Sequence, residues 1–387
     1  PSCARTQKMN SLVIMVLLCC SAQSSELELA EQACDTAIER GNAFLYSRQT
    51  KNGGLSLNAT PALHDVWANA ETNRSWHIAT TSIAAMAWMA QPQDDARDLR
   101  IARAIDYLCK SPLVKRPDDW DTDNTWAYVY SLCALTRAGN NAYIEKTHRT
   151  KMIRQRAQVI MQELYKYQSP MGGWAYYADE TKAVTPNWAT SFQTAVAVIG
   201  LLEAKQLGWS VDEHRLRVAI DTLIHCRLPD GSYTYSVEII PRVDTGTGID
   251  NVKGGLSRIQ SCNYALYLAK QMGYKSPIGH EQIITGLQQL FANHHYLDIA
   301  RGRPTPHEAY HYNSGYFYFF GHYYAGLLLE MLPKKEAQPF FSPYVNSVVK
   351  TQHGDGSMLD FFLDASGKEY GAAFGVAGLC HARNSLK

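Results

Sequence analysis

The residues most capable of chemistry form an acidic cluster just before an apolar segment. It comprises Asp118, Asp119, Asp121 and Asp123, followed by Asn124. A carboxylic acid that its surroundings keep neutral can donate a proton to a substrate, and a neighbouring carboxylate can tune it. Aspartate and asparagine also cap helices, because their oxygens accept hydrogen bonds from free backbone N–H groups. The sequence therefore predicts either a catalytic pair, with Asp123 as proton donor and Asp121 beside it, or a helix cap.

A second cluster has the spacing of a zinc site without its context. Residues 307–311 read His-Glu-Ala-Tyr-His. A metalloprotease needs both histidines on a sustained helix and a third ligand. Pro306 precedes the segment, Gly315 follows soon after, and no third ligand stands at a familiar spacing. A zinc peptidase is therefore the weaker reading. We predict instead that the protein needs no metal or cofactor and that four residues line a ligand site: His307, Glu308, Tyr310 and His311.

Two kinds of helix alternate along the chain with a period of about 60 residues. In the first kind, apolar residues recur on one stripe, as in Ile101, Ala104, Ile105 and Leu108. The second kind is apolar on every side and must be buried on every side. Its copies cover residues 78–90, 125–138, 190–204, 259–270, 316–332 and 370–381. This alternation predicts an all-α fold, an α/α toroid of six helical hairpins with inner and outer rings.

The half-polar helices end in glycine-rich turns that begin with a polar residue. The turns occupy residues 49–54, 168–174, 227–233 and 352–358. Glycine after a helix end permits a left-handed backbone. We expect the glutamines Gln49, Gln168 and Gln352 to hydrogen-bond the backbone of a neighbouring helix and so to stabilise the fold.

These turns carry a family resemblance. The sequence around Arg40, Gly41, Phe44, Leu45 and Gln49, and the run from Gln168 to Trp174, resemble the QW repeats of the squalene–hopene cyclase and protein prenyltransferase superfamily. The resemblance covers about residues 27–385. It is strongest to prenyltransferase/squalene-oxidase-repeat proteins, whose activity is generally unassigned. The resemblance implies a terpenoid-cyclase-like toroid and does not specify a reaction.

Residues 121–124 resemble the DxDD acid motif of protonating terpene cyclases. That likeness implies that Asp123 donates the proton, that Asp121 and Asn124 tune it, and that aromatic rings stabilise the cation. Two departures weaken the likeness: the last carboxylate is Asn124, and such cyclases place their site between two barrels. The zinc set of prenyltransferases is not matched, because Asp250 and Cys262 are too far apart and His322 lies two turns into its segment.

The remaining candidate ligand residues stand at the expected starts of the apolar helices. They are His77, Trp126, Trp188, Arg258 and Tyr316. Longer segments at 112–123, 235–255 and 298–313 are expected to be loops at the same end of the ring. Such residues would form an aromatic pocket for a polyprenyl lipid or stacked sugar rings. Packing in the core is the alternative for each.

The N-terminus predicts export. Met9 is the expected start, Leu12–Cys20 is a short apolar run, and cleavage is expected after Ala22. We assign residues 1–25 to the signal peptide and over-extended start and residues 26–387 to one toroid domain. The mature protein is expected in the periplasm or outside the cell, with a lipid anchor on Cys19 or Cys20 as an alternative.

Composition excludes some partners. The chain has 37 basic and 36 acidic residues and no basic run, so we expect no nucleic-acid partner. The apolar run is too short for a stable membrane span. The six scattered cysteines after residue 30 have no metal-type spacing and are expected to pack in the core, with a disulfide or two as the alternative.

Three functions remain open on the sequence. The first is a terpenoid-cyclase-like protein whose central aromatic cavity binds an apolar or isoprenoid-type ligand, with or without catalysis. The second is a polysaccharide lyase or glycosidase with carboxylates near Asp121, Asp123 and Glu308. The third is a non-catalytic scaffold. If the protein is an enzyme, the resemblance implies a terpene cyclase-like isomerase or lyase.

Overall fold

The computed structural model describes most of the chain. The described residues are 2–57, 69–117, 119–177, 186–237, 248–303, 311–360 and 367–387, without the side chains of residues 2–24 and Tyr316. Three of the predicted ligand residues, His307, Glu308 and Tyr310, lie outside them.

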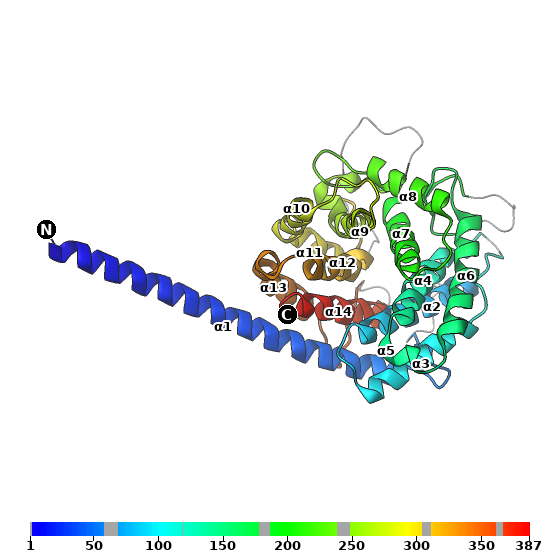
Figure 1. The fold of residues 1–387 in the computed structure, drawn as a ribbon, viewed down its shortest axis with the longest axis horizontal. Helices are drawn as coiled ribbons and strands as arrows, with labels where there is room; N and C mark the ends of the chain where they lie inside the picture. Colours follow the sequence, from blue (N-terminus) through cyan, green and yellow to red (C-terminus); the bar gives the residue numbers. More distant parts are fainter. Residues whose placement is uncertain are drawn as a thin grey trace.

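The apolar helices form a closed inner ring. In chain order each one contacts the next, and the last contacts the first (Figure 1). They are α2 (Ala70–Met89), α4 (Asn124–Gly139), α7 (Ser191–Gln206), α9 (Val252–Gln271), α12 (Tyr318–Met331) and α14 (Gly367–Asn384). The predicted α/α toroid is confirmed.

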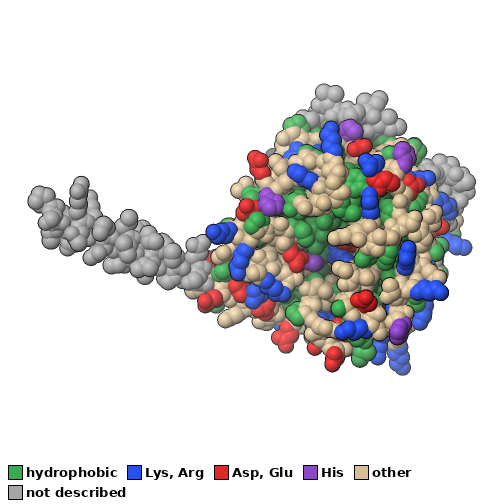
Figure 2. Space-filling model, viewed as in Figure 1, with side chains coloured by type: hydrophobic (Ala, Val, Ile, Leu, Met, Phe, Trp, Pro, Cys, Tyr) green, Lys and Arg blue, Asp and Glu red, His purple; other side chains and the backbone are tan. Residues whose placement is uncertain are grey.

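The half-polar helices lie outside this ring and turn their apolar stripes inward. In α3 the predicted stripe is buried: Ile101, Ala104, Ile105 and Leu108. Figure 2 shows charged side chains spread around the rim of one face. The outer helices are α1 (Ser2–Arg48), α3 (Asp95–Lys110), α6 (Thr150–Tyr167), α8 (Glu213–His225), α10 (His280–Ala292) and α13 (Lys334–Val349).

Short elements complete the described fold. They are the helices α5 (Ala142–Glu145) and α11 (His295–Arg301), the 3-10 turns η1 (Gly248–Asp250) and η2 (Gly315–Phe317), and the strands β1 (Ala189–Thr190) and β2 (Ser236–Val237). The strands pair antiparallel, with Ala189 opposite Val237.

Two predicted loops are therefore shorter than expected. The segment 235–255 holds β2, η1 and the first turn of α9, and the segment 298–313 begins inside α11. Helix α9 begins early because the Asn251 side chain accepts a hydrogen bond from the Gly254 N–H at 2.8 Å. The two glycines that follow Lys253 hid this cap, since glycine disfavours helix.

Helix α1 begins at Ser2, and its N-terminal part extends away from the ring (Figure 1). Within the described residues, no helix combines the length and apolarity needed to cross a bilayer. The division of the chain near residue 25 stays a prediction.

The glutamine turns tie three of the outer helices, α1, α6 and α13, to a neighbouring outer helix. Gln49 Nε2 donates to the Gly53 carbonyl within its own turn at 3.1 Å and to the Arg100 carbonyl on α3 at 2.9 Å. Gln168 makes the same pair of bonds, reaching the Arg215 carbonyl on α8 at 3.1 Å. The predicted bonding to a neighbouring helix is confirmed.

The last of these turns closes the ring. Gln352, after α13, donates to the Ala37 carbonyl on α1 at 2.9 Å. Gly356 in the same turn has φ +86°, and a Cβ there would lie 2.3 Å from the Arg40 carbonyl oxygen. Only glycine fits this approach, because other residues are strained at positive φ and would clash. The ends of the toroid are thus joined by the same kind of contact that joins α1 to α3 and α6 to α8.

Candidate functional site

The first turns of the inner helices bring aromatic rings together on the axis of the ring. We call this set the axial aromatic cluster: Trp76, Trp126, Tyr130, Phe192, Phe320, Tyr370 and Phe374. Its members are all buried. Trp126 of α4 and Phe320 of α12, which lie on opposite sides of the ring, have centroids 6.3 Å apart. At this level, within the described residues, side chains fill the axis instead of lining an open cavity.

Asp123 lies just before α4 and contacts the axial aromatic cluster through Trp76. Its Oδ2 accepts a hydrogen bond from Trp76 Nε1 at 3.4 Å, and the Trp76 ring is 6.0 Å from Trp126 and 5.2 Å from Tyr370. The Ser75 hydroxyl donates to the Asp123 carbonyl at 2.7 Å. With φ +61°, Asp123 is in the left-handed region at the start of α4, and its side chain makes no capping bond to that helix. The carboxyl is therefore directed to the tryptophan and not to the helix it precedes.

The surroundings of Asp123 favour the neutral acid. Burial raises the pKa of its carboxyl to about 6, while the bond from Trp76 acts in the opposite direction. The residue keeps partial exposure at the surface, so it can exchange protons with solvent. A carboxylic acid that is part protonated near neutral pH can act as a general acid.

Asp121 has a different role from Asp123. Its Oδ1 accepts hydrogen bonds from the backbone N–H groups of Glu71 at 3.1 Å and Thr72 at 3.2 Å, in the first turn of α2. It is buried, and its charge lies at the positive end of that helix. Asp121 thus caps the preceding inner helix, and the structure does not join it to Asp123 as a catalytic pair.

Two predicted ligand residues lie in or beside the cluster. Trp126 belongs to it. Trp188 is part exposed and packs edge-on against Tyr176 at 5.2 Å, and Tyr176 in turn packs against Phe192 at 5.8 Å. These rings extend the aromatic surface from the axis towards the rim.

The other described candidates make contacts typical of packing. His77 Nδ1 lies 2.9 Å from the Leu55 carbonyl, and burial lowers the pKa of its ring. Arg258 is buried and donates to the carbonyls of Gly254 at 3.3 Å and of Ile249. His311 is buried with its ring edge-on to Tyr296 at 4.6 Å. Only the backbone of Tyr316 is described, in η2. His77, Arg258 and His311 make no described contact with Asp123.

Sequence reasoning missed the most intimate contacts of the site. Ser75 was not a candidate, nor were Phe192, Phe320 and Phe374. A usable signal existed, because each of these aromatic residues falls within the first two turns of an apolar segment.

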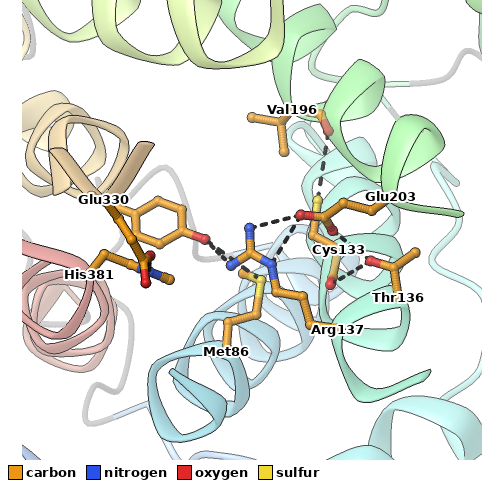
Figure 3. Close-up of polar contacts among 9 residues, drawn as sticks. Met86, Cys133, Thr136, Arg137, Val196, Glu203, Glu330 and His381 are labelled. Carbon is orange, nitrogen blue, oxygen red and sulfur yellow. Dashed lines mark hydrogen bonds and ion pairs between the residues drawn. The ribbon is translucent and has the colours of Figure 1, made fainter. Parts of the chain in front are cut away.

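A second polar cluster lies at the other end of the inner helices (Figure 3). Arg137, near the end of α4, points into the ring and donates through Nε and Nη2 to Glu203 Oε1 of α7, at 3.2 and 3.1 Å. Its Nη1 bonds the Tyr323 hydroxyl of the opposite helix α12. His381 and Glu330 pair nearby at 2.5 Å. These bonds cross-link the inner ring.

The cysteines whose side chains the structure describes do not form a site. The six from Cys34 onward are free thiols, and all but the partly exposed Cys109 are buried. Burial raises the pKa of Cys226 to about 11 and that of Cys380 to about 12, so these thiols are unreactive near neutral pH. They pack as expected from the sequence.

Fold and cluster define a class: an α/α toroid of the terpenoid-cyclase-like type. The family model described as the squalene–hopene cyclase C-terminal domain matches residues 12–248. That is more than half of the chain, and the chain belongs to this family. No curated protein matches the sequence.

Solved structures show the same fold at low sequence identity. The type II terpene cyclase MstE from Scytonema, solved with its product merosterolic acid A, has a TM-score of 0.52 and 14% identity, covering 93% of this chain and 99% of that one. An inactive α-1,6-mannanase from Salegentibacter, solved with an α-1,6-mannotetraose, has a TM-score of 0.55 and 13% identity over 92% and 99%. A family 88 glycosyl hydrolase from Bacteroides vulgatus has a TM-score of 0.53 and 12% identity, covering 92% of this chain and 99% of that one. Likeness at this level establishes the toroid and leaves the activity open.

Proposed function

We propose that the protein binds an apolar, isoprenoid-type molecule at the end of the inner ring that carries Asp123, and that Asp123 protonates it. The observation that carries this proposal is the Asp123 carboxyl beside the Trp76 ring, with its pKa raised to about 6. An apolar substrate offers no strong hydrogen bonds, so aromatic surface is the natural means of holding it.

The chemistry balances with one acid. The O–H bond of Asp123 breaks and its proton forms a C–H bond to one alkene carbon, which leaves a cation on the other carbon and a carboxylate on the protein. An aromatic face turned towards that cation would stabilise it by about 0.5–2 kcal/mol. Loss of a proton from the cation to water, or addition of water, completes the reaction, and Asp123 regains its proton from solvent.

Two neighbours are relevant to the choice of substrate. The Scytonema cyclase is solved with merosterolic acid A, and the Salegentibacter enzyme with a mannose oligosaccharide. A glycosidase needs two carboxyl groups flanking the bond that breaks. Since Asp121 is engaged with the first turn of α2, it does not offer the second carboxyl that a glycosidase needs beside Asp123.

A non-catalytic scaffold is the second candidate. It is favoured by the rings that meet across the axis, such as Tyr130 and Phe374 with centroids 5.5 Å apart. In that case the axial aromatic cluster is a packed core, and Asp123 serves only to form the left-handed turn before α4.

Binding of squalene by the purified protein distinguishes these candidates. Lipid extraction and native mass spectrometry identify any co-purified molecule, and tryptophan fluorescence follows added squalene. We expect saturable quenching that Trp76→Ala weakens at least tenfold and that the control Trp209→Phe, next to Gly139 at the far end of α4, leaves unchanged. Equal affinity in all three proteins, or binding of mannose oligosaccharides alone, would reject the isoprenoid site.

We further propose that the mature protein is exported, supported by the apolar run Leu12–Cys20 and the small residues after it. N-terminal sequencing of the protein from its native host should begin at Gln23. A chain that retains Met9 would contradict export by this route, and a lipid-modified Cys19 or Cys20 would identify an anchored form.

A further inference from the structure

A chain of buried imidazoles links α11 to α12, away from Asp123. His294, just before α11, lies with its Nε2 3.0 Å from the Nε2 of His322 in α12. On the other side, His294 Nδ1 is 3.1 Å from Asp298 Oδ2, and His322 Nδ1 is 2.7 Å from the Tyr318 carbonyl. His322 is fully buried, and His294 is 8% exposed. All three separations are hydrogen-bond distances.

The groups at the two ends of this series of hydrogen bonds, the Asp298 carboxylate and the Tyr318 carbonyl, determine how many protons it needs. A carboxylate and a backbone carbonyl only accept hydrogen bonds, so the Nδ1 of each histidine must be the donor towards its end of the chain. A neutral imidazole carries one N–H, and each histidine has then used it. Both Nε2 atoms would be bare lone pairs facing each other at 3.0 Å, which is repulsive in a dry interior. Three hydrogen bonds need three protons, whereas two neutral rings supply two.

We propose that His294 and His322 together bind one extra proton, forming a buried imidazole–imidazolium pair whose charge is balanced by Asp298. The two Nε2 atoms thus form a site for one cation, and that cation is a proton. This proton explains why the two Nε2 atoms tolerate a separation of 3.0 Å.

The charges around the pair agree with this assignment. Burial opposes ionisation of Asp298, but hydrogen bonds from His294 and from Lys350, whose Nζ is 2.7 Å away, hold the pKa of the carboxyl below its usual range. Burial first, and the charge of His294 second, lower the pKa of His322 to about 3. His322 therefore stays the acceptor, and the shared proton belongs to Nε2 of His294.

The surrounding elements carry charges of both signs. Helix α11 contributes Asp298 and Arg301, α13 contributes Tyr344, α12 contributes Tyr318, and Lys350 directly follows α13. Asp360, which precedes α14, acts electrostatically on Tyr318, and Lys253 of α9 lies over the Tyr296 ring. Asp298 is the carboxylate in direct contact with the pair, so it supplies the compensating charge.

A metal ion is the competing occupant. Ligating histidines commonly hold their second nitrogen against a carboxylate or carbonyl, as both do here. A metal site also needs further ligands, and across the described ranges no group of three or more histidine, cysteine, aspartate or glutamate side chains is placed to hold one. The proton needs no third ligand.

Nitrogen NMR of the whole protein labelled with ring-¹⁵N histidine tests this directly. At pH 7, after chelator treatment, we expect one histidine with both ring nitrogens protonated and a second with only Nδ1 protonated, joined by a coupling across the Nε2–Nε2 hydrogen bond. His294→Asn and His322→Phe assign the two rings. Each should abolish the coupling, and His322→Phe should also abolish the imidazolium signal of His294. Because the wild type itself is observed, a variant that fails to fold does not weaken the test.

Two results would overturn the proposal. One is a pair of neutral rings at pH 7, with no coupling between them. The other is a stoichiometric metal ion that survives the chelator, or Zn²⁺ added afterwards that shifts both Nε2 signals to coordinated values at one equivalent. Neither result bears on Asp123, so the proposed function stands or falls separately.

Discussion

Replacing Asp123 by asparagine should stabilise the folded protein at pH 8 and leave its stability unchanged at pH 4. A carboxyl whose pKa is raised in the folded state binds its proton more tightly there than in the unfolded chain. That preference favours folding fully below the unfolded pKa of 3.8 and is lost as the pH rises through about 6. Above that range the ionised, partly buried carboxylate is a cost that the amide does not have.

The magnitude follows from the same two values. Each pH unit between 3.8 and about 6 corresponds to about 1.4 kcal/mol, which gives an upper value of about 3 kcal/mol. Solvent reaches part of the side chain, so we expect about 1–3 kcal/mol. Asparagine tolerates the left-handed backbone at this position, so the substitution adds no strain.

Urea unfolding at pH 4, 6 and 8 measures the effect. The matched control is Asp121→Asn, which removes a negative charge from the N-terminal end of α2 and should destabilise the protein at pH 8 by about 0.3–1 kcal/mol. The two neighbouring aspartates therefore respond with opposite signs. Loss of stability in Asp123→Asn at pH 8, or a gain that does not depend on pH, would refute the reasoning about the acid.

Three further predictions concern the fold. Gln352→Met removes the side-chain hydrogen bonds to Ala37 of α1 and to Gly356 and should lower the unfolding free energy by about 1–3 kcal/mol in urea. An unchanged midpoint would mean that these two bonds add no stability to the closure of the ring. Gly356→Ala places a Cβ 2.3 Å from the Arg40 carbonyl oxygen and should lower the unfolding free energy by at least about 2 kcal/mol. The control Gly354→Ala has open space around it and should leave the unfolding free energy unchanged. Equal melting temperatures of the two variants would contradict the close approach. His322 takes up a proton near pH 6.5 in the unfolded chain but only near pH 3 in the folded protein. The free energy of unfolding should therefore fall by about 3 kcal/mol between pH 7 and pH 4. Urea unfolding at the two pH values should show a smaller fall in His322→Phe.

The fold could be predicted because its cause is local in the sequence. Segments apolar on every side alternate with striped ones, and only a ring inside a ring buries both kinds. The glutamine turns could be predicted for the same reason, since helix end, glycine and glutamine are adjacent in the chain. The start of α9 was less predictable, because Asn251 caps it while its glycines disfavour helix.

The site was harder to predict because its contacts join distant segments. Asp121 looks like a partner of Asp123, yet it caps α2 through Glu71 and Thr72, some fifty residues earlier. The Trp76 contact with Asp123 forms only once α2 and α4 lie side by side. Sequence spacing indicates which residues lie in the same turn, but the packing of the toroid determines which turns come into contact.

Incubation with squalene in D₂O tests the central claim most directly. If Asp123 donates its proton to an alkene, the product of the wild-type protein should gain one deuterium per protonation, detected by mass spectrometry. Asp123→Asn should still bind squalene and yield no deuterated product. Deuterium uptake that persists in Asp123→Asn, or none in a wild type that binds squalene, would contradict the role of Asp123.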